Sequence, residues 1–141
     1  MDSGEAKPAL KRVAVAHTDA GRVLIAGLGK RSEFGPEQAR VAAAAAAGRA
    51  KELGAVSLSW AVPGGEGLTA ALVEGTLLKL YSFDRFKASA SGDDESGLET
   101  LELAGEAVSE SELELGRVGA EAANAARDLQ NLPSNLSLIH I

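Results

Sequence analysis

The chain has 141 residues, of which 45% are hydrophobic and 24% charged, a balance typical of a globular domain and not of a disordered or fibrous chain. The formal net charge of -6 argues against nucleic-acid binding, which requires a clustered surplus of lysine and arginine. Cysteine is absent, which removes disulfides and thiolate chemistry and favours a cytoplasmic location.

Two apolar runs near the N-terminus are predicted to form strands, after an unpatterned lead-in over residues 1–10. Residues 12–16 and 22–28 are rich in valine, isoleucine and leucine, and a short polar stretch separates them. The second run is almost continuously apolar, as expected of a strand that is covered on both faces. Because no helix separates the two runs, they form either a hairpin or part of a longer arrangement.

Three later segments are predicted to form helices. The first begins at Pro36 and ends before Gly54, because proline suits a first helical turn and glycine suits the residue that follows a helix. The second begins near Leu68 and is apolar on more than one side, so another element, domain or subunit must cover it. The third spans residues 110–131, and its apolar residues recur at spacings of three and four. They are Leu115, Val118, Ala122, Ala125, Ala126, Leu129 and Leu132.

The order of strands and helices predicts the fold class. Residues 56–62 alternate as a strand between the first two helices, and residues 98–103 form a less regular strand before the third. Such alternation is typical of an α/β fold with a mixed, mainly parallel sheet flanked by helices.

A glycine-rich turn follows the second strand and is a weak candidate for phosphate binding. Gly27, Gly29 and Lys30 could let backbone amides approach a phosphate. The dinucleotide fingerprint would need glycine at Ser32, however, and a P-loop would need glycine at Leu24. A plain strand-to-helix turn is therefore favoured, with binding of a phosphate or an ADP-ribose-like group as the alternative.

The sequence predicts no catalytic constellation. His17 and His140 are the only histidines, and no carboxylate spacing beside them indicates a metal site. The acidic residues 93–95 lack the ligand pattern of a calcium loop. We therefore predict that this chain contributes no catalytic residue, binds no metal and holds no cofactor.

The end of the second helix combines three aromatic and three charged residues within residues 81–87. This segment either packs on the core of its own domain or contacts another domain or subunit. The candidate contact residues are Tyr81, Phe83, Asp84, Arg85, Phe86 and Lys87.

Three segments together resemble the leucyl aminopeptidase, or cytosol aminopeptidase, family. They are RVLIAGLGKRSEF at 22–34, ALVEGTLLKLYSFDRFK at 71–87 and ANAARDLQNLPSN at 123–135. The third is similar to the family segment that joins the N-terminal domain to the catalytic domain. Its matching residues are Asn124, Ala126, Arg127, Asp128, Leu129, Asn131, Pro133 and Asn135.

The resemblance implies a division of the chain and a function for its parent protein. Residues 11–122 would form a non-catalytic N-terminal domain with a macro-domain-like three-layer arrangement, and 123–135 the interdomain linker. The parent would remove N-terminal amino acids, preferably leucine, from peptides with two divalent cations, manganese or zinc. Those cations would bind in a catalytic domain that is absent here. The expected partners are that domain and the other subunits of a homo-hexamer, without nucleic acid or membrane.

The resemblance also predicts that the domain is incomplete at both ends. The last six residues, LSLIHI at 136–141, depart from the family pattern and are typical of a non-native tail. An incomplete domain would leave a sheet edge and apolar surface uncovered. We therefore expect marginal stability or aggregation.

Overall fold

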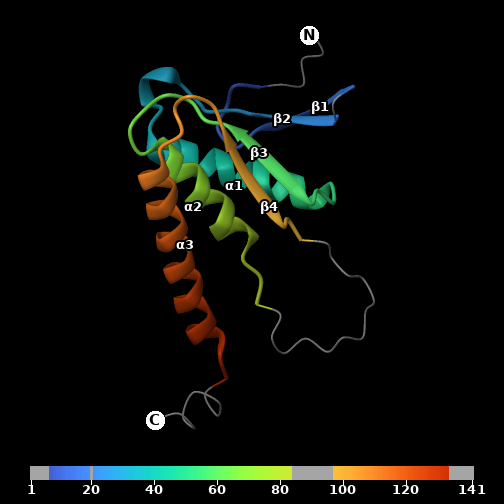
Figure 1. Ribbon diagram of the computed structural model, residues 1–141. Helices are drawn as coiled ribbons and strands as arrows, with labels where there is room; N and C mark the ends of the chain where they lie inside the picture. Colours follow the sequence, from blue (N-terminus) through green and yellow to red (C-terminus); the bar gives the residue numbers. More distant parts are fainter. Residues whose placement is uncertain (1–6, 20, 84–96, 134–141) are drawn as a thin grey trace.

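The computed structural model describes residues 7–19, 21–83 and 97–133, and every strand and helix predicted from the sequence is present in it (Figure 1). This confirms the mixed α/β fold class. The elements are β1 (Val13–Thr18), β2 (Gly21–Ala26), the short 3-10 helix η1 (Arg31–Glu33), α1 (Pro36–Glu52), β3 (Ser57–Ala61), α2 (Leu68–Leu80), β4 (Thr100–Ala104) and α3 (Glu110–Asn131).

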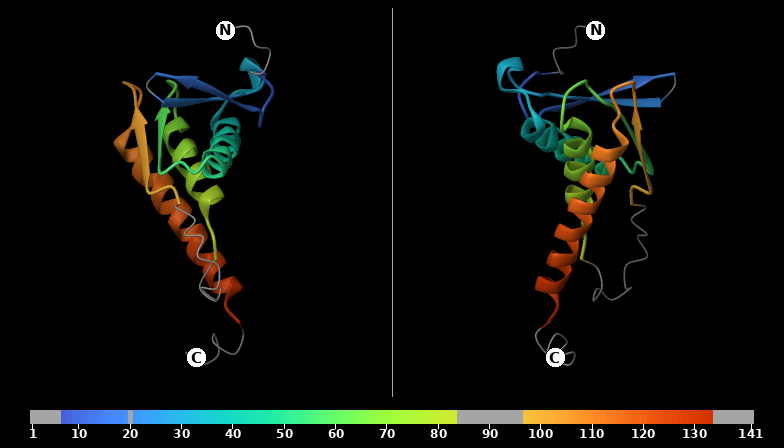
Figure 2. Two further views of the ribbon diagram at one scale, coloured as in Figure 1. Left: turned by 90° about the vertical axis from the view of Figure 1, so that its right-hand side faces the viewer. Right: turned by 60° about the vertical axis from the view of Figure 1, so that its left-hand side comes forward.

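The described strands form two separate pairs. β1 and β2 make an antiparallel hairpin in which Val13 lies opposite Ala26, whereas β3 and β4 are parallel, with Ser57 opposite Thr100. The hairpin runs across the direction of β3 and β4 (Figure 2). The expectation of one mainly parallel sheet is therefore only partly correct. A connection as short as the one between β1 and β2 can join only antiparallel strands.

The described helices cover one face of β3 and β4. Along each of these strands exposed residues alternate with half-buried ones, which shows that the opposite face is open. On the covered face, Trp60 Nε1 donates to Thr76 Oγ1 of α2 at 3.2 Å. This part of the molecule therefore has two layers, and the third layer expected from the family resemblance is not present among the described residues.

Small residues let α1 pack closely against α2. Six alanines of α1 are buried: Ala39, Ala42, Ala43, Ala46, Ala47 and Ala50. On the α2 side, a Cβ added at Gly75 would collide with the backbone oxygen of Arg40. The Arg40 side chain then reaches across the same interface, where its Nε lies 2.8 Å from Glu74 Oε2. Close helix packing of this kind requires glycine at position 75.

The N-terminal ends of α2 and α3 are joined by hydrogen bonds. The Glu112 carboxylate accepts from the backbone amides of Gly67 at 2.7 Å and Thr69 at 3.1 Å. The first amides of a helix have no partner within the helix, so Glu112 of α3 caps α2. Further along, a Cβ added at Gly116 would lie 2.5 Å from the Ala70 oxygen, so these two helices also touch closely.

The core lies between α1, α2 and the strand pair β3–β4. Its buried residues are Ala39, Ala43, Val62, Leu68, Ala71 and Leu72, with Phe34, Trp60, Leu103 and Val108 packed against them. The predicted burial of α2 on several sides is confirmed, because α1, α3 and β3 all contact it. Among the helices that the structure describes, none has the length and hydrophobicity of a membrane-spanning segment.

Candidate functional site

Residues from two of the sequence motifs meet where α2 ends beside α3. The two helices start at the same end of the domain and run side by side (Figure 1). Near their C-terminal ends, Asn124 Nδ2 donates to the backbone oxygen of Leu77 at 3.4 Å, and Arg127 donates to that of Leu78 at 3.1 Å. The last carbonyls of a helix have no partner within it, so α3 caps α2 at this end as well.

Tyr81 extends this contact beyond the end of α2. Its hydroxyl donates to Asp128 Oδ1 at 2.8 Å and accepts from Asn131 Nδ2 at 3.2 Å. The Arg127 guanidinium lies 5.4 Å from the centre of the Tyr81 ring, within the range of a cation–π interaction. We call Tyr81, Asn124, Arg127, Asp128 and Asn131 the exit cluster. It fixes the C-terminal half of α3 against the chain that leaves α2.

Four of the other predicted contact and linker residues are among those that the structure describes. Ala126, Leu129 and Pro133 are exposed, and Phe83 is half-buried. Asp84, Arg85, Phe86, Lys87 and Asn135 lie outside the described residues, so their predicted roles stay predictions.

An apolar stripe runs along the exposed side of α3. We define the α3 stripe as Leu115, Val118, Ala122, Ala125 and Leu129, which recur at spacings of three and four and are all exposed. The exposed fractions are 69% for Leu115, 48% for Val118 and 71% for Leu129. The buried residues of α3 are instead Gly116 and Ala120. An exposed apolar stripe of this kind indicates a surface that another element covers.

The backbone amides of the glycine turn after β2 donate hydrogen bonds within the domain. Gly27 N donates to Arg12 O at 2.7 Å, and Gly29 N donates to Pro8 O at 2.8 Å. Lys30 Nζ lies 3.1 Å from Glu33 Oε1. A Cβ at Gly27 would collide with the backbone oxygen of Ala9. These contacts support the interpretation of a close-packed structural turn, since the two glycine amides already have backbone acceptors.

Comparison with known protein families identifies the family to which the chain belongs. The profile of the cytosol aminopeptidase family, N-terminal domain, matches residues 3–90, which is more than half of the sequence. The chain belongs to this family.

Two relatives and one solved structure show which part of the family it represents. A probable cytosol aminopeptidase of Roseiflexus castenholzii is 38% identical over 142 residues, covering 94% of this chain and 29% of the relative. One from Mycobacterium tuberculosis is 33% identical over 135 residues, covering 94% and 26%. The structure of the bottromycin maturation enzyme BotP in complex with Mn matches with a TM-score of 0.75 and 26% identity, over 91% of this chain and 28% of that one. This cytosol aminopeptidase domain thus spans less than a third of each protein it matches.

Glu112, which positions α2 and α3 of the cytosol aminopeptidase domain, was not identified from the sequence. Ser109 and Glu112 have the serine-to-glutamate spacing of a capping box, and Ser109 Oγ accepts from Glu112 N at 3.4 Å. The spacing therefore signals the start of α3. It gives no indication that the Glu112 carboxylate turns to α2, because that contact joins residues more than 40 positions apart.

The described part of the cytosol aminopeptidase domain contains no cluster of three or more His, Cys, Asp or Glu side chains that could hold a metal ion. His17, the one histidine among these residues, is exposed in β1. No metal ligand is therefore assigned to any described residue.

The exit cluster changes the acidity of Tyr81. Partial burial raises the pKa of its hydroxyl, the hydrogen bond to Asp128 raises it further, and the hydrogen bond from Asn131 opposes the shift. Because the folded pKa lies above the unfolded value, the stabilisation is fully present below about pH 10 and is lost as pH rises through the folded pKa.

We expect Tyr81 to ionise at a higher pH in the folded domain than in urea. It is the only tyrosine, so the ultraviolet absorbance of phenolate reports on it alone. Asp128→Asn should lower the folded midpoint, because it removes the charge that holds the phenol protonated. Glu121→Gln removes a charge elsewhere on α3 and should leave the midpoint unchanged. Equal midpoints for the folded wild type and Asp128→Asn would contradict the exit cluster.

Proposed function

We propose that this domain is the non-catalytic N-terminal part of an aminopeptidase that removes N-terminal amino acids, preferably leucine, from peptides. Family membership supports this proposal, together with the share of each relative that lies beyond the matched segment. We assign two divalent cations, manganese or zinc, to that remaining part. When bound there, they supply Lewis-acid activation of water and of the scissile carbonyl.

We propose that the α3 stripe is where the catalytic domain docks. The observation that carries this proposal is the exposure of Leu129, which belongs to the linker motif yet contributes no hydrogen bond to the exit cluster. Burying leucine side chains is favourable by about 1.5–3 kcal/mol each, so a stripe of this length can hold two domains together. The exit cluster would set the direction in which the linker leaves the domain.

We further propose that the parent assembles as a homo-hexamer in the cytoplasm. The residues after Tyr81 would then contact a neighbouring subunit or the catalytic domain. This part of the proposal rests on the family resemblance alone.

A chimaera tests the docking proposal. Residues 7–133 would replace the matching segment of the Roseiflexus castenholzii relative, and both leucyl p-nitroanilide hydrolysis with manganese and the mass by light scattering would be measured. We expect an active hexamer. Leu129→Glu should reduce the amount of active hexamer about tenfold or more, because it places an unpaired charge in the docked surface.

Gln130→Glu is the matched control, since it adds the same charge at an adjacent exposed position of α3. It should behave like the unmodified chimaera. If Leu129→Glu and Gln130→Glu are equally active and equally assembled, the α3 stripe is not the docking surface.

A further inference from the structure

The α3 stripe has the spacing of a coiled-coil seam. Its five residues follow one another at intervals of three, four, three and four, so two of every seven residues belong to it. A strict two-in-seven repeat is narrower than the face that a helix turns to a globular core, and it is the pattern by which one helix packs along another. At about 1.5 Å per residue, the α3 stripe is about 21 Å long. Its shape therefore fits one partner helix.

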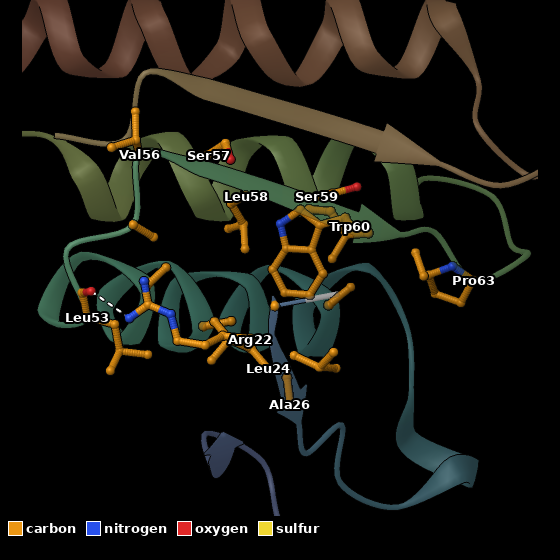
Figure 3. Close-up of a pocket in the computed structure, with 18 of the residues that line it drawn as sticks. Arg22, Leu24, Ala26, Leu53, Val56, Ser57, Leu58, Ser59, Trp60 and Pro63 are labelled. Carbon is orange, nitrogen blue, oxygen red and sulfur yellow. Dashed lines mark hydrogen bonds between the residues drawn. The ribbon is translucent and has the colours of Figure 1, made fainter. Parts of the chain in front are cut away.

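The α3 stripe is separate from the cavity beside β3. That cavity has a volume of about 800 Å³, and residues of β2, α1 and β3 line it, among them Leu24 and Trp60 (Figure 3). None of the lining residues belongs to α3. A partner can therefore cover the α3 stripe without entering this cavity.

The two borders of the α3 stripe differ in charge. One border carries Glu114, Glu121 and Asp128, which recur every seven residues and are all exposed. We call these three residues the acidic border. The opposite border carries Gly119 and Ala126, which are also seven residues apart and exposed. Nothing stands within 4 Å of the position that a Cβ on Gly119 would take. The charge beside the α3 stripe is therefore negative and lies along one side.

Arg117 links the acidic border without neutralising it. Its Nη2 lies 2.7 Å from Glu114 Oε1, and its Nη1 lies 2.6 Å from Glu121 Oε1. The bond to Arg117 lowers the pKa of the Glu114 carboxyl, so this group stays charged at neutral pH. Three carboxylates and one guanidinium leave a net charge of -2 along the border. The Glu114 and Glu121 side chains are each 58% exposed, so both can contact a partner.

A second copy of α3 would match these borders poorly. In an antiparallel pair the two acidic borders would face each other, and their like charges would repel. In a parallel pair each acidic border would face Gly119 and Ala126, which offer no positive charge. In both pairs Ala122 and Ala125, at the centre of the α3 stripe, would meet alanines of the other copy. Small residues on both sides would leave the middle of the seam poorly filled.

We propose that the element of the catalytic domain that docks on the α3 stripe is an amphipathic helix with lysine or arginine along one border. This inference rests on the proposed docking function of the α3 stripe. The basic side chains would lie against the acidic border, and large apolar side chains would fill the space over Ala122 and Ala125. Because only one border of α3 is charged, the pairing also fixes the direction of the helix. Bordering charges determine partner and orientation in helix pairs of this kind.

Fluorescence anisotropy of a dye-labelled peptide tests this partner chemistry. The basic probe is a capped peptide of three heptads with leucine at the seam positions, lysine at the bordering positions and alanine elsewhere. The acidic probe has glutamate in place of lysine. Titration with the 141-residue chain should give saturable binding of the basic probe and at least about tenfold weaker binding of the acidic probe. Added salt should weaken the basic complex, because exposed charges are screened.

Two double variants show whether the acidic border makes the contact. Glu114→Gln with Glu121→Gln removes two charges from the border, and it should weaken binding of the basic probe about tenfold. Glu102→Gln with Glu106→Gln removes the same charge from exposed residues outside α3, and it should bind like the wild type. Circular dichroism checks that each variant is folded. In the chimaera, the first pair should reduce the amount of active hexamer and the second should not.

Three results would overturn the proposal. The folded wild type could bind the basic probe no better than the acidic probe, or the two double variants could behave alike. Light scattering could also show a wild-type dimer that Leu129→Glu dissociates, which would place a second copy on the α3 stripe. The docking function is tested separately by Leu129→Glu in the chimaera. If that variant loses the active hexamer while the two double variants behave alike, docking is supported and the basic helix is excluded.

Discussion

Gly75→Ala should destabilise the domain by about 2–3 kcal/mol. The added Cβ would collide with the backbone oxygen of Arg40, and it would lie 3.0 Å from Ala43 Cβ. Neither atom belongs to a flexible side-chain end, so α1 and α2 would have to move apart. Such a movement would open the core around Leu72, which these helices enclose. The urea midpoint of unfolding, followed by circular dichroism, measures the loss.

Gly119→Ala is the matched control for this substitution. Gly119 also lies within a helix, but nothing stands within 4 Å of the position its Cβ would take. Because alanine favours helix more than glycine does, this variant should be more stable than the wild type by up to about 1 kcal/mol. We expect Gly75→Ala to lower the free energy of unfolding and Gly119→Ala to raise it. Equal effects would mean that close approach of α1 and α2 does not control stability.

Glu112→Ala should cost about 2–3 kcal/mol, because hydrogen bonds to a charged group are stronger than neutral ones and both amide donors would lose their acceptor. The donors are the amides of Gly67 and Thr69, at the start of α2. Since Glu112 belongs to α3, its loss should also loosen the contact between the two helices. Urea unfolding measures the free energy, and hydrogen exchange at Thr69 reports the local opening.

Glu110→Ala is the control that separates the loss of the Glu112 hydrogen bonds from the general effect of removing a negative charge. Glu110 lies in the same first turn of α3 and is exposed. Its removal takes away only a favourable interaction with the helix dipole, about 0.3–1 kcal/mol. If Glu110→Ala proves as harmful as Glu112→Ala, the bridge from Glu112 to α2 does not contribute as described.

Local chemistry made the helices predictable. Pro36 marks the start of α1 correctly, and α1 ends at Glu52, two residues before Gly54, which has the positive φ of 65° expected after a helix. The pairing of the strands was less predictable, because it depends on contacts between distant segments. The short connection between β1 and β2 decided the hairpin, and nothing local to β3 indicated that β4 would be its partner.

The apolar spacing of α3 was misleading about which face is buried. Leu115, Val118 and Leu129 follow the pattern of a core-facing stripe, yet all three are exposed. The face that packs on α2 carries Gly116 and Ala120, whose small size permits close approach. The hydrophobic pattern therefore predicted the helix correctly but did not predict which face of α3 packs on the domain's own core.

The exit cluster could be predicted only in part. Tyr81 and Asp128 were each identified, one as a contact residue and the other as part of the linker. Their mutual hydrogen bond joins positions 47 apart, so neither motif alone revealed it. The structure thus gives these motif residues a role within the domain, and Leu129 takes no part in their hydrogen bonds.

We propose that this chain is a non-catalytic domain of a longer aminopeptidase. The most direct test is hydrolysis of leucyl p-nitroanilide by the purified 141-residue chain, with manganese or zinc added and folding checked by circular dichroism. We predict no turnover above that of the metal alone, while the chimaera with the Roseiflexus castenholzii relative is active under the same conditions. Metal-dependent turnover by the folded 141-residue chain would contradict the claim.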